Sequence, residues 1–161
     1  MVLGLSLPMF TLLHSAISII AIAAGLIYFV WLGLRRHWLD AFNNLFLLFT
    51  ALTSITGFLF PPKPIGPPFI FGVVSLLLLA IALFALYRGR LAGAWRPAYL
   101  ISALLAQWLN MVVLVVQSYQ KIPALHAFAP TGAEPPVLAT QAAVLLLVLL
   151  LGWRVLRRRA H

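Results

Sequence analysis

The chain has 161 residues, of which 64% are hydrophobic and only 8% are charged, and it carries a formal net charge of +9. Soluble globular domains are about half apolar and about a quarter charged, so this composition excludes a soluble domain and also a disordered chain. The absence of cysteine excludes disulfides, thiolate metal sites, iron–sulfur clusters and thiol catalysis.

Five segments without Asp, Glu, Lys or Arg follow one another along the chain. Each is long enough to cross the ~30 Å hydrocarbon core of a bilayer as a helix. Unbroken aliphatic runs such as residues 145–151 are unlike the alternating strands of a membrane β-barrel. We therefore predict a single all-α domain, a bundle of five transmembrane helices at residues 8–34, 41–60, 67–87, 97–119 and 136–155.

Basic residues predict the topology of these spans. All nine arginines fall on one side of a five-pass path, whereas the other side holds only Lys63 and Lys121. The positive-inside rule then places the arginine side in the cytoplasm, with the N-terminus outside and the C-terminus inside. The net charge is explained as a topology signal and a contact with lipid headgroups, so no nucleic-acid partner is expected.

Aromatic residues gather near the predicted helix ends, where Trp and Tyr rings prefer the interface between membrane and water. The residues expected at the arginine-side interface are Tyr28, Trp31, Trp38, Tyr87, Trp95, Tyr99 and Trp153. Trp108 is the exception, because it falls near the middle of the fourth span. Its indole N–H is expected to have a partner inside the bundle.

The longest connection, residues 121–136, falls on the outer side and contains apolar residues at three-residue spacing. Pro123 favours the start of a short helix of one or two turns, lying on the membrane surface with its apolar side down. An irregular loop is the alternative. We predict that this segment covers a cavity as a lid, and the residues assigned to the lid are Ile122, Leu125, His126 and Phe128.

Polar side chains recur at helical spacing within the spans and concentrate in the predicted outer half. In a bundle such residues usually face other helices, where amides and hydroxyls form hydrogen bonds. Their concentration at one depth also favours a cavity open toward the outer leaflet, so both interpretations stay open. The candidate ligand-binding residues are His14, Ser18, Thr53, Ser75, Trp108, Asn110, Gln117 and Gln141.

Catalytic chemistry has little support in the sequence. No carboxylate falls within a predicted span, and motifs of nucleotide-binding proteins, metalloproteases and serine hydrolases are missing. We therefore predict no catalytic residue, no metal site and no cofactor. His14 is the one ionisable side chain well inside a span, and haem ligation by His14 together with His126 has no supporting spacing.

The predicted function is non-catalytic: an accessory subunit, or a binder of a hydrophobic ligand such as a lipid or quinone in the outer half of the bundle. Membrane lipids are the expected partners, and other membrane subunits or a second copy of the chain are further candidates. The alternatives are an oligomeric small-molecule channel or transporter, and a membrane enzyme or haem protein that depends on His14.

Four stretches carry a resemblance to known proteins: residues 14–16 (HSA), 56–61 (TGFLFP), 93–96 (GAWR) and 115–136 (VVQSYQKIPALHAFAPTGAEPP). With these, the chain resembles uncharacterised small multi-spanning inner-membrane proteins of proteobacteria over most of its length. The resemblance implies a location in the bacterial inner (cytoplasmic) membrane and a multi-pass topology. It carries over no catalytic residue.

Overall fold

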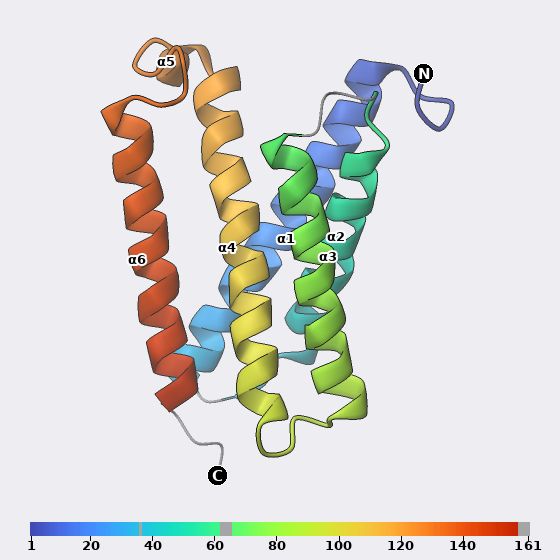
Figure 1. Ribbon diagram of the computed structural model, residues 1–161, viewed down its shortest axis with the longest axis vertical. Coiled ribbons are helices and arrows are strands. Elements are labelled where there is room, and N and C mark those ends of the chain that lie inside the picture. Colours follow the sequence, from blue (N-terminus) through green and yellow to red (C-terminus); the bar gives the residue numbers. More distant parts are fainter. Residues whose placement is uncertain (36, 62–65, 158–161) are drawn as a thin grey trace.

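The computed structural model describes residues 1–35, 37–61 and 66–157, and these ranges are mostly helical (Figure 1). The elements in chain order are α1 (Leu7–Arg35), α2 (Asp40–Phe58), α3 (Pro67–Leu83), the π-helix η1 (Phe84–Arg88), α4 (Trp95–Lys121), α5 (Pro123–His126) and α6 (Pro135–Arg157). The described ranges contain no named strand. With α3 and η1 taken as one span, the described residues form five helices that are long and apolar enough to cross a membrane, which confirms the predicted all-α architecture.

Prolines set several of the helix ends. Pro67, Pro123 and Pro135 occupy the first turns of α3, α5 and α6, where the fixed φ of proline suits a helix and its missing N–H is not needed. α2 ends at Phe58, two residues earlier than expected, because Pro61 disfavours helical backbone in the residue before it. The other ends of the five spans lie within two residues of the predicted positions.

The connection between the third span and α4 is a tight turn that begins in the π-helix η1. Gly89 follows η1, and a Cβ at this position would lie 2.4 Å from Trp95 Cγ, so only glycine lets the indole pack against the turn. The Trp95 ring also packs on Phe84, with ring centroids 5.0 Å apart. This packing joins α3 and α4 as an antiparallel hairpin.

Two hairpins, α1–α2 and α3–α4, form most of the bundle, and α6 packs along α4 (Figure 1). α4 is the central helix: 61% of its most apolar stretch is buried inside the protein, against 17% for α6. α1 crosses the bundle obliquely and meets α6 near the end of both helices, where Gly33 faces Val155. α6 is therefore held mainly by α4.

The described arginines all lie at one end of the bundle, which we call the arginine end. They are Arg35, Arg88, Arg90, Arg96, Arg154 and Arg157. α5 and the N-terminus lie at the opposite end (Figure 1). The bundle thus has one strongly basic end, and the direction in which it crosses a membrane stays a prediction.

The core near the arginine end contains aromatic and polar side chains. Tyr28 and Tyr99 are fully buried there, so their rings face the interior of the bundle and not its surface, and their depth relative to a membrane stays a prediction. Tyr99 O–H donates a hydrogen bond to Asn43 Oδ1. The Trp38 ring lies 5.3 Å from the Tyr28 ring and 5.4 Å from the Tyr99 ring. Trp38, in the short connection between α1 and α2, therefore packs over both tyrosines and closes them off from the surface.

Candidate ligand groove between α4 and α6

His14 faces α2, where its Nδ1 lies 2.7 Å from Thr56 Oγ1. The Thr56 hydroxyl donates to the Leu52 carbonyl at 2.7 Å, so it accepts from His14, and the imidazole carries a proton on Nδ1. Ser18 Oγ donates to the His14 carbonyl at 2.8 Å, and the Phe60 ring packs edge-on to the imidazole at 5.2 Å. The His14–Thr56 contact joins α1 to α2, and both His14 and Ser18 form hydrogen bonds within the protein, without a ligand.

Asn110 joins α4 to α2, because its Nδ2 donates to Thr50 Oγ1 at 3.0 Å. Thr50 precedes Thr56 by six residues, about 9 Å along the helix axis. His14 and Asn110 therefore bond to different turns of α2. The predicted grouping of these two side chains in one ligand site has no support in these contacts.

Three further candidates are spread over three helices: Thr53 on α2, Ser75 on α3 and Gln117 on α4. Ser75 is buried, whereas Thr53 and Gln117 are half-buried. Thr53 Oγ1 is buried without a hydrogen-bond partner among the described residues. None of the three lines the groove described below.

The predicted lid segment forms a single helical turn, α5, which packs against α4 at the end opposite the arginines. Ile122, His126 and Phe128 are exposed, and Leu125 is half-buried. The structure does not bring His126 to His14, because α5 lies over α4 and α6 whereas His14 faces α2 (Figure 1). Ala129, which follows α5 and is fully buried, closes this end of the α4–α6 contact instead of the predicted lid residues.

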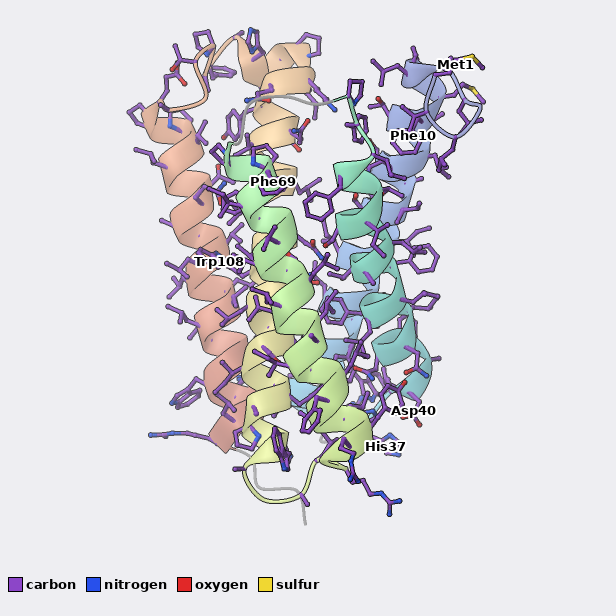
Figure 2. The ribbon with its side chains drawn as sticks, turned by 45° about the vertical axis from the view of Figure 1, so that its right-hand side comes forward. Met1, Phe10, His37, Asp40, Phe69 and Trp108 are labelled. Atoms are coloured by element: carbon purple, nitrogen blue, oxygen red, sulfur yellow. The ribbon has the colours of Figure 1, made fainter. Side chains whose placement is uncertain are left out.

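Two of the predicted site residues, Trp108 and Gln141, meet at a groove of about 320 Å³ between α4 and α6. Val112, Ala142 and Leu145 complete its lining. Trp108 lies about halfway along the bundle (Figure 2). The groove is open on one side, and aliphatic and aromatic surface makes up almost all of its walls.

The polar atoms beside this groove are only partly satisfied. Gln141 Nε2 donates to the Val112 carbonyl at 3.1 Å, but Gln141 Oε1 is buried and has no partner in the part of the chain that the structure describes. Trp108 Nε1 is also buried without a partner among the described residues, so the predicted partner for this N–H inside the bundle is not found. An unmade hydrogen bond of a buried group costs about 1–3 kcal/mol. Two residues that line the groove therefore also carry one unused donor and one unused acceptor, and both of these atoms are covered by protein.

Hydrogen bonds close the α4–α6 contact toward the α5 end. Tyr119 Oη lies 3.0 Å from Thr140 Oγ1, and it donates to the Pro136 carbonyl at 3.3 Å. Tyr119 and Thr140 were not among the predicted site residues. The lining residues Val112, Ala142 and Leu145 could not be predicted either, because aliphatic side chains in an apolar span give no signal of their own.

Metal binding has no support in the described residues, which contain no group of three or more His, Cys, Asp or Glu that could hold an ion. No family model, curated protein or solved structure matches the chain. The function is therefore inferred from the geometry of the groove.

Proposed function

We propose that this chain is a multi-pass protein of the bacterial inner membrane that binds a hydrophobic molecule, a lipid or a quinone, in the groove between α4 and α6. The observation that carries the proposal is the pair of buried, unpartnered polar atoms, Trp108 Nε1 and Gln141 Oε1, beside an otherwise apolar groove. Ligand sites have this composition: mainly apolar walls with a few placed polar groups.

The chemistry of the two atoms defines what the groove can hold. Both atoms are covered by protein, so a ligand reaches them only when the Trp108 and Gln141 side chains shift toward the groove. A carbonyl or hydroxyl oxygen of a ligand can then accept from Trp108 Nε1–H, and a hydroxyl can also donate to Gln141 Oε1. Hydrocarbon chains of bulk lipid can do neither, so the two atoms favour a molecule with a polar group at this depth. The volume of about 320 Å³ matches the lower end of ligand pockets, roughly 300–1,000 Å³. It holds a ring or headgroup, while an attached chain extends into the lipid.

The lining also favours binding over catalysis. Its five residues are Trp, Val, Gln, Ala and Leu, none of which titrates near neutral pH or acts as a nucleophile. These residues support a protein that binds a ligand, and we propose that it does so as an accessory subunit.

A matched pair of α6 variants tests the proposal. Ala142→Phe places a ring in the groove, whereas Ala143→Phe makes the same change at the next residue, which does not line it. Decylubiquinone, which only accepts hydrogen bonds, and dioleoylglycerol, which also donates, serve as probes. At least one probe should raise the unfolding temperature of the wild type and of Ala143→Phe in mild detergent, and it should not affect Ala142→Phe.

Native mass spectrometry of the same proteins reports bound molecules directly. The wild type and Ala143→Phe should retain a probe that Ala142→Phe releases. If Ala142→Phe binds the probes as well as Ala143→Phe does, or if neither probe binds the wild type, the groove is not the ligand site. In that case Trp108 and Gln141 are packing residues.

A further inference from the structure

The last turns of α1 and α6 carry the same pattern at the arginine end. Trp31 precedes Arg35 by four residues, and Trp153 precedes Arg157 by four residues. No other tryptophan in the chain has an arginine at this spacing. In each pair the guanidinium lies over the indole ring, at 5.6 Å in α1 and 4.8 Å in α6. Residues four apart share one face of a helix, so the spacing itself produces this contact.

Both pairs lie on the surface of the bundle. Trp31 is 41% exposed and Trp153 is 54% exposed, and both arginines are exposed. Neither Arg35 nor Arg157 forms an ion pair with a described residue. Carboxylate side chains are scarce, because Asp40 and Glu134 are the only ones in the chain. The two guanidinium groups therefore keep their hydrogen-bond donors available to an anion.

Packing between α1 and α6 fixes the two Trp–Arg pairs at the same depth along the bundle. A Cβ on Gly33 would lie 3.8 Å from Val155 Cγ1 and 3.9 Å from Arg154 Cβ, so the two helix ends are in contact. Gly33 and Val155 are buried in this contact, whereas the Trp–Arg pairs lie on exposed sides of the same turns. The bundle thus presents two similar cationic pairs at one depth.

We propose that each Trp–Arg pair is an anchor for the phosphate of one anionic phospholipid in the leaflet at the arginine end. The planar guanidinium offers two parallel N–H donors, which match two phosphate oxygens. The indole ring beneath it holds the guanidinium in place and lies where Trp prefers to be, between headgroups and hydrocarbon. These anchors are distinct from the α4–α6 groove and do not depend on the ligand proposed there.

The test compares two double variants that remove the same charge from the same end. Arg35→Gln with Arg157→Gln removes both anchors, whereas Arg88→Gln with Arg90→Gln removes two exposed arginines for which no Trp contact is found. Each protein is placed in phosphatidylcholine nanodiscs that contain a minority of phosphatidylglycerol. Native mass spectrometry then counts the retained phosphatidylglycerol molecules.

We expect the wild type to retain two phosphatidylglycerol molecules. The anchor variant should bind each about fivefold more weakly, which corresponds to one lost arginine per lipid, while the Arg88/Arg90 variant changes binding less than twofold. Millimolar inorganic phosphate should not displace the lipid. Equal losses in the two variants, or displacement by phosphate, would show a general effect of charge and overturn the proposal.

Substitution of the indole rings distinguishes lipid binding by the Trp–Arg pairs from a general attraction of the net positive charge to anionic lipid. Trp31→Leu with Trp153→Leu leaves every arginine in place, so bulk attraction to an anionic bilayer is unchanged. If the rings hold the guanidinium groups, retention of phosphatidylglycerol falls while retention of phosphatidylcholine does not. Unchanged phosphatidylglycerol binding in this variant contradicts the paired anchor.

Discussion

The contact between the α1–α2 hairpin and α4 differs from the contact between α4 and α6, because only the second lies beside the groove. Buried side chains of the first contact form three cross-helix hydrogen bonds: Tyr99 to Asn43, Asn110 to Thr50 and Gln107 to the Ile22 carbonyl. In the second, Trp108 and Gln141 leave a donor and an acceptor unused beside a groove. Protein interiors are close-packed, and most of their buried polar groups form hydrogen bonds. Tyr28 Oη and Gln107 Oε1 on the first side are also buried without a partner among the described residues, so the two regions differ in the groove and not in the presence of unused polar atoms.

The largest effect is expected for Gly25→Ala, on the packed side. A Cβ at this position would lie 2.2 Å from Gln107 Oε1 and 2.8 Å from Phe46 Cδ2. Relieving this overlap costs about 1–3 kcal/mol, so the unfolding temperature in detergent should fall clearly. Gly57→Ala is the matched control, because its nearest neighbour is His14 Cε1 at 3.8 Å and alanine favours a helix by about 1 kcal/mol. Equal stability of the two variants would mean that the first contact is not tightly packed.

A second comparison removes the polar group of one aromatic side chain in each region, the hydroxyl of Tyr99 and the indole N–H of Trp108. Tyr99→Phe leaves buried Asn43 Oδ1 without its donor and should lower the free energy of unfolding by about 1–3 kcal/mol. Trp108→Phe replaces the indole by a smaller ring, which costs packing, but it also removes a buried N–H that has no partner among the described residues. The lost packing and the removal of the unpaired N–H therefore offset each other. In ligand-free detergent we expect Trp108→Phe to be the milder change. Thermal unfolding checks this order, and a larger loss for Trp108→Phe would show that its N–H is bonded after all.

A smaller effect is expected for Asn110→Leu, which removes the hydrogen bond to Thr50 Oγ1. Interhelical bonds of this kind contribute about 0.6–2 kcal/mol in membrane proteins. Leu114→Ile, on an exposed position of the same helix, is the control and should leave the unfolding temperature nearly unchanged. Identical melting of the two variants would place Asn110 outside the packed contact.

The smallest effect is local and concerns Glu134. The Thr131 backbone N–H and hydroxyl and the Ala133 N–H donate to its carboxylate at 2.8, 2.8 and 3.0 Å, which lowers the pKa of Glu134 to about 2. Because the folded pKa lies below the ordinary value of 4.5, the turn is fully stabilised above about pH 4.5 and loses this support as the pH falls toward 2. Glu134→Gln should therefore lower the hydrogen-exchange protection of these two amides at neutral pH. Unaltered protection would contradict the assignment.

The positions of the helices could be predicted because each span is a charge-free run that ends at charged residues or prolines. The rotation of each helix about its own axis could not. Tyr28 and Trp31 lie one turn apart near the same end of α1, yet Tyr28 is fully buried and Trp31 is exposed. In an almost uniformly apolar span, hydropathy does not distinguish the face that contacts lipid from the face that contacts another helix.

The candidate site could be predicted only in part, for a related reason. Trp108 and Gln141 were candidates because they are polar within apolar spans, and the structure brings them together. His14 and Asn110 met the same criterion but use hydroxyls on different turns of α2. Which polar residues satisfy one another depends on the register between helices, and a single sequence does not contain that register.

The side opening of the α4–α6 groove has a consequence for how the proposed ligand would enter it. A molecule dissolved in a bilayer reaches such a groove by diffusing in the plane of the membrane, without passing through water. Its occupancy then follows its mole fraction in the lipid phase and not its aqueous solubility. For the ligand proposed above, partitioning into the bilayer would concentrate it beside the protein, so modest contacts with Trp108 and Gln141 would be enough to keep the groove occupied.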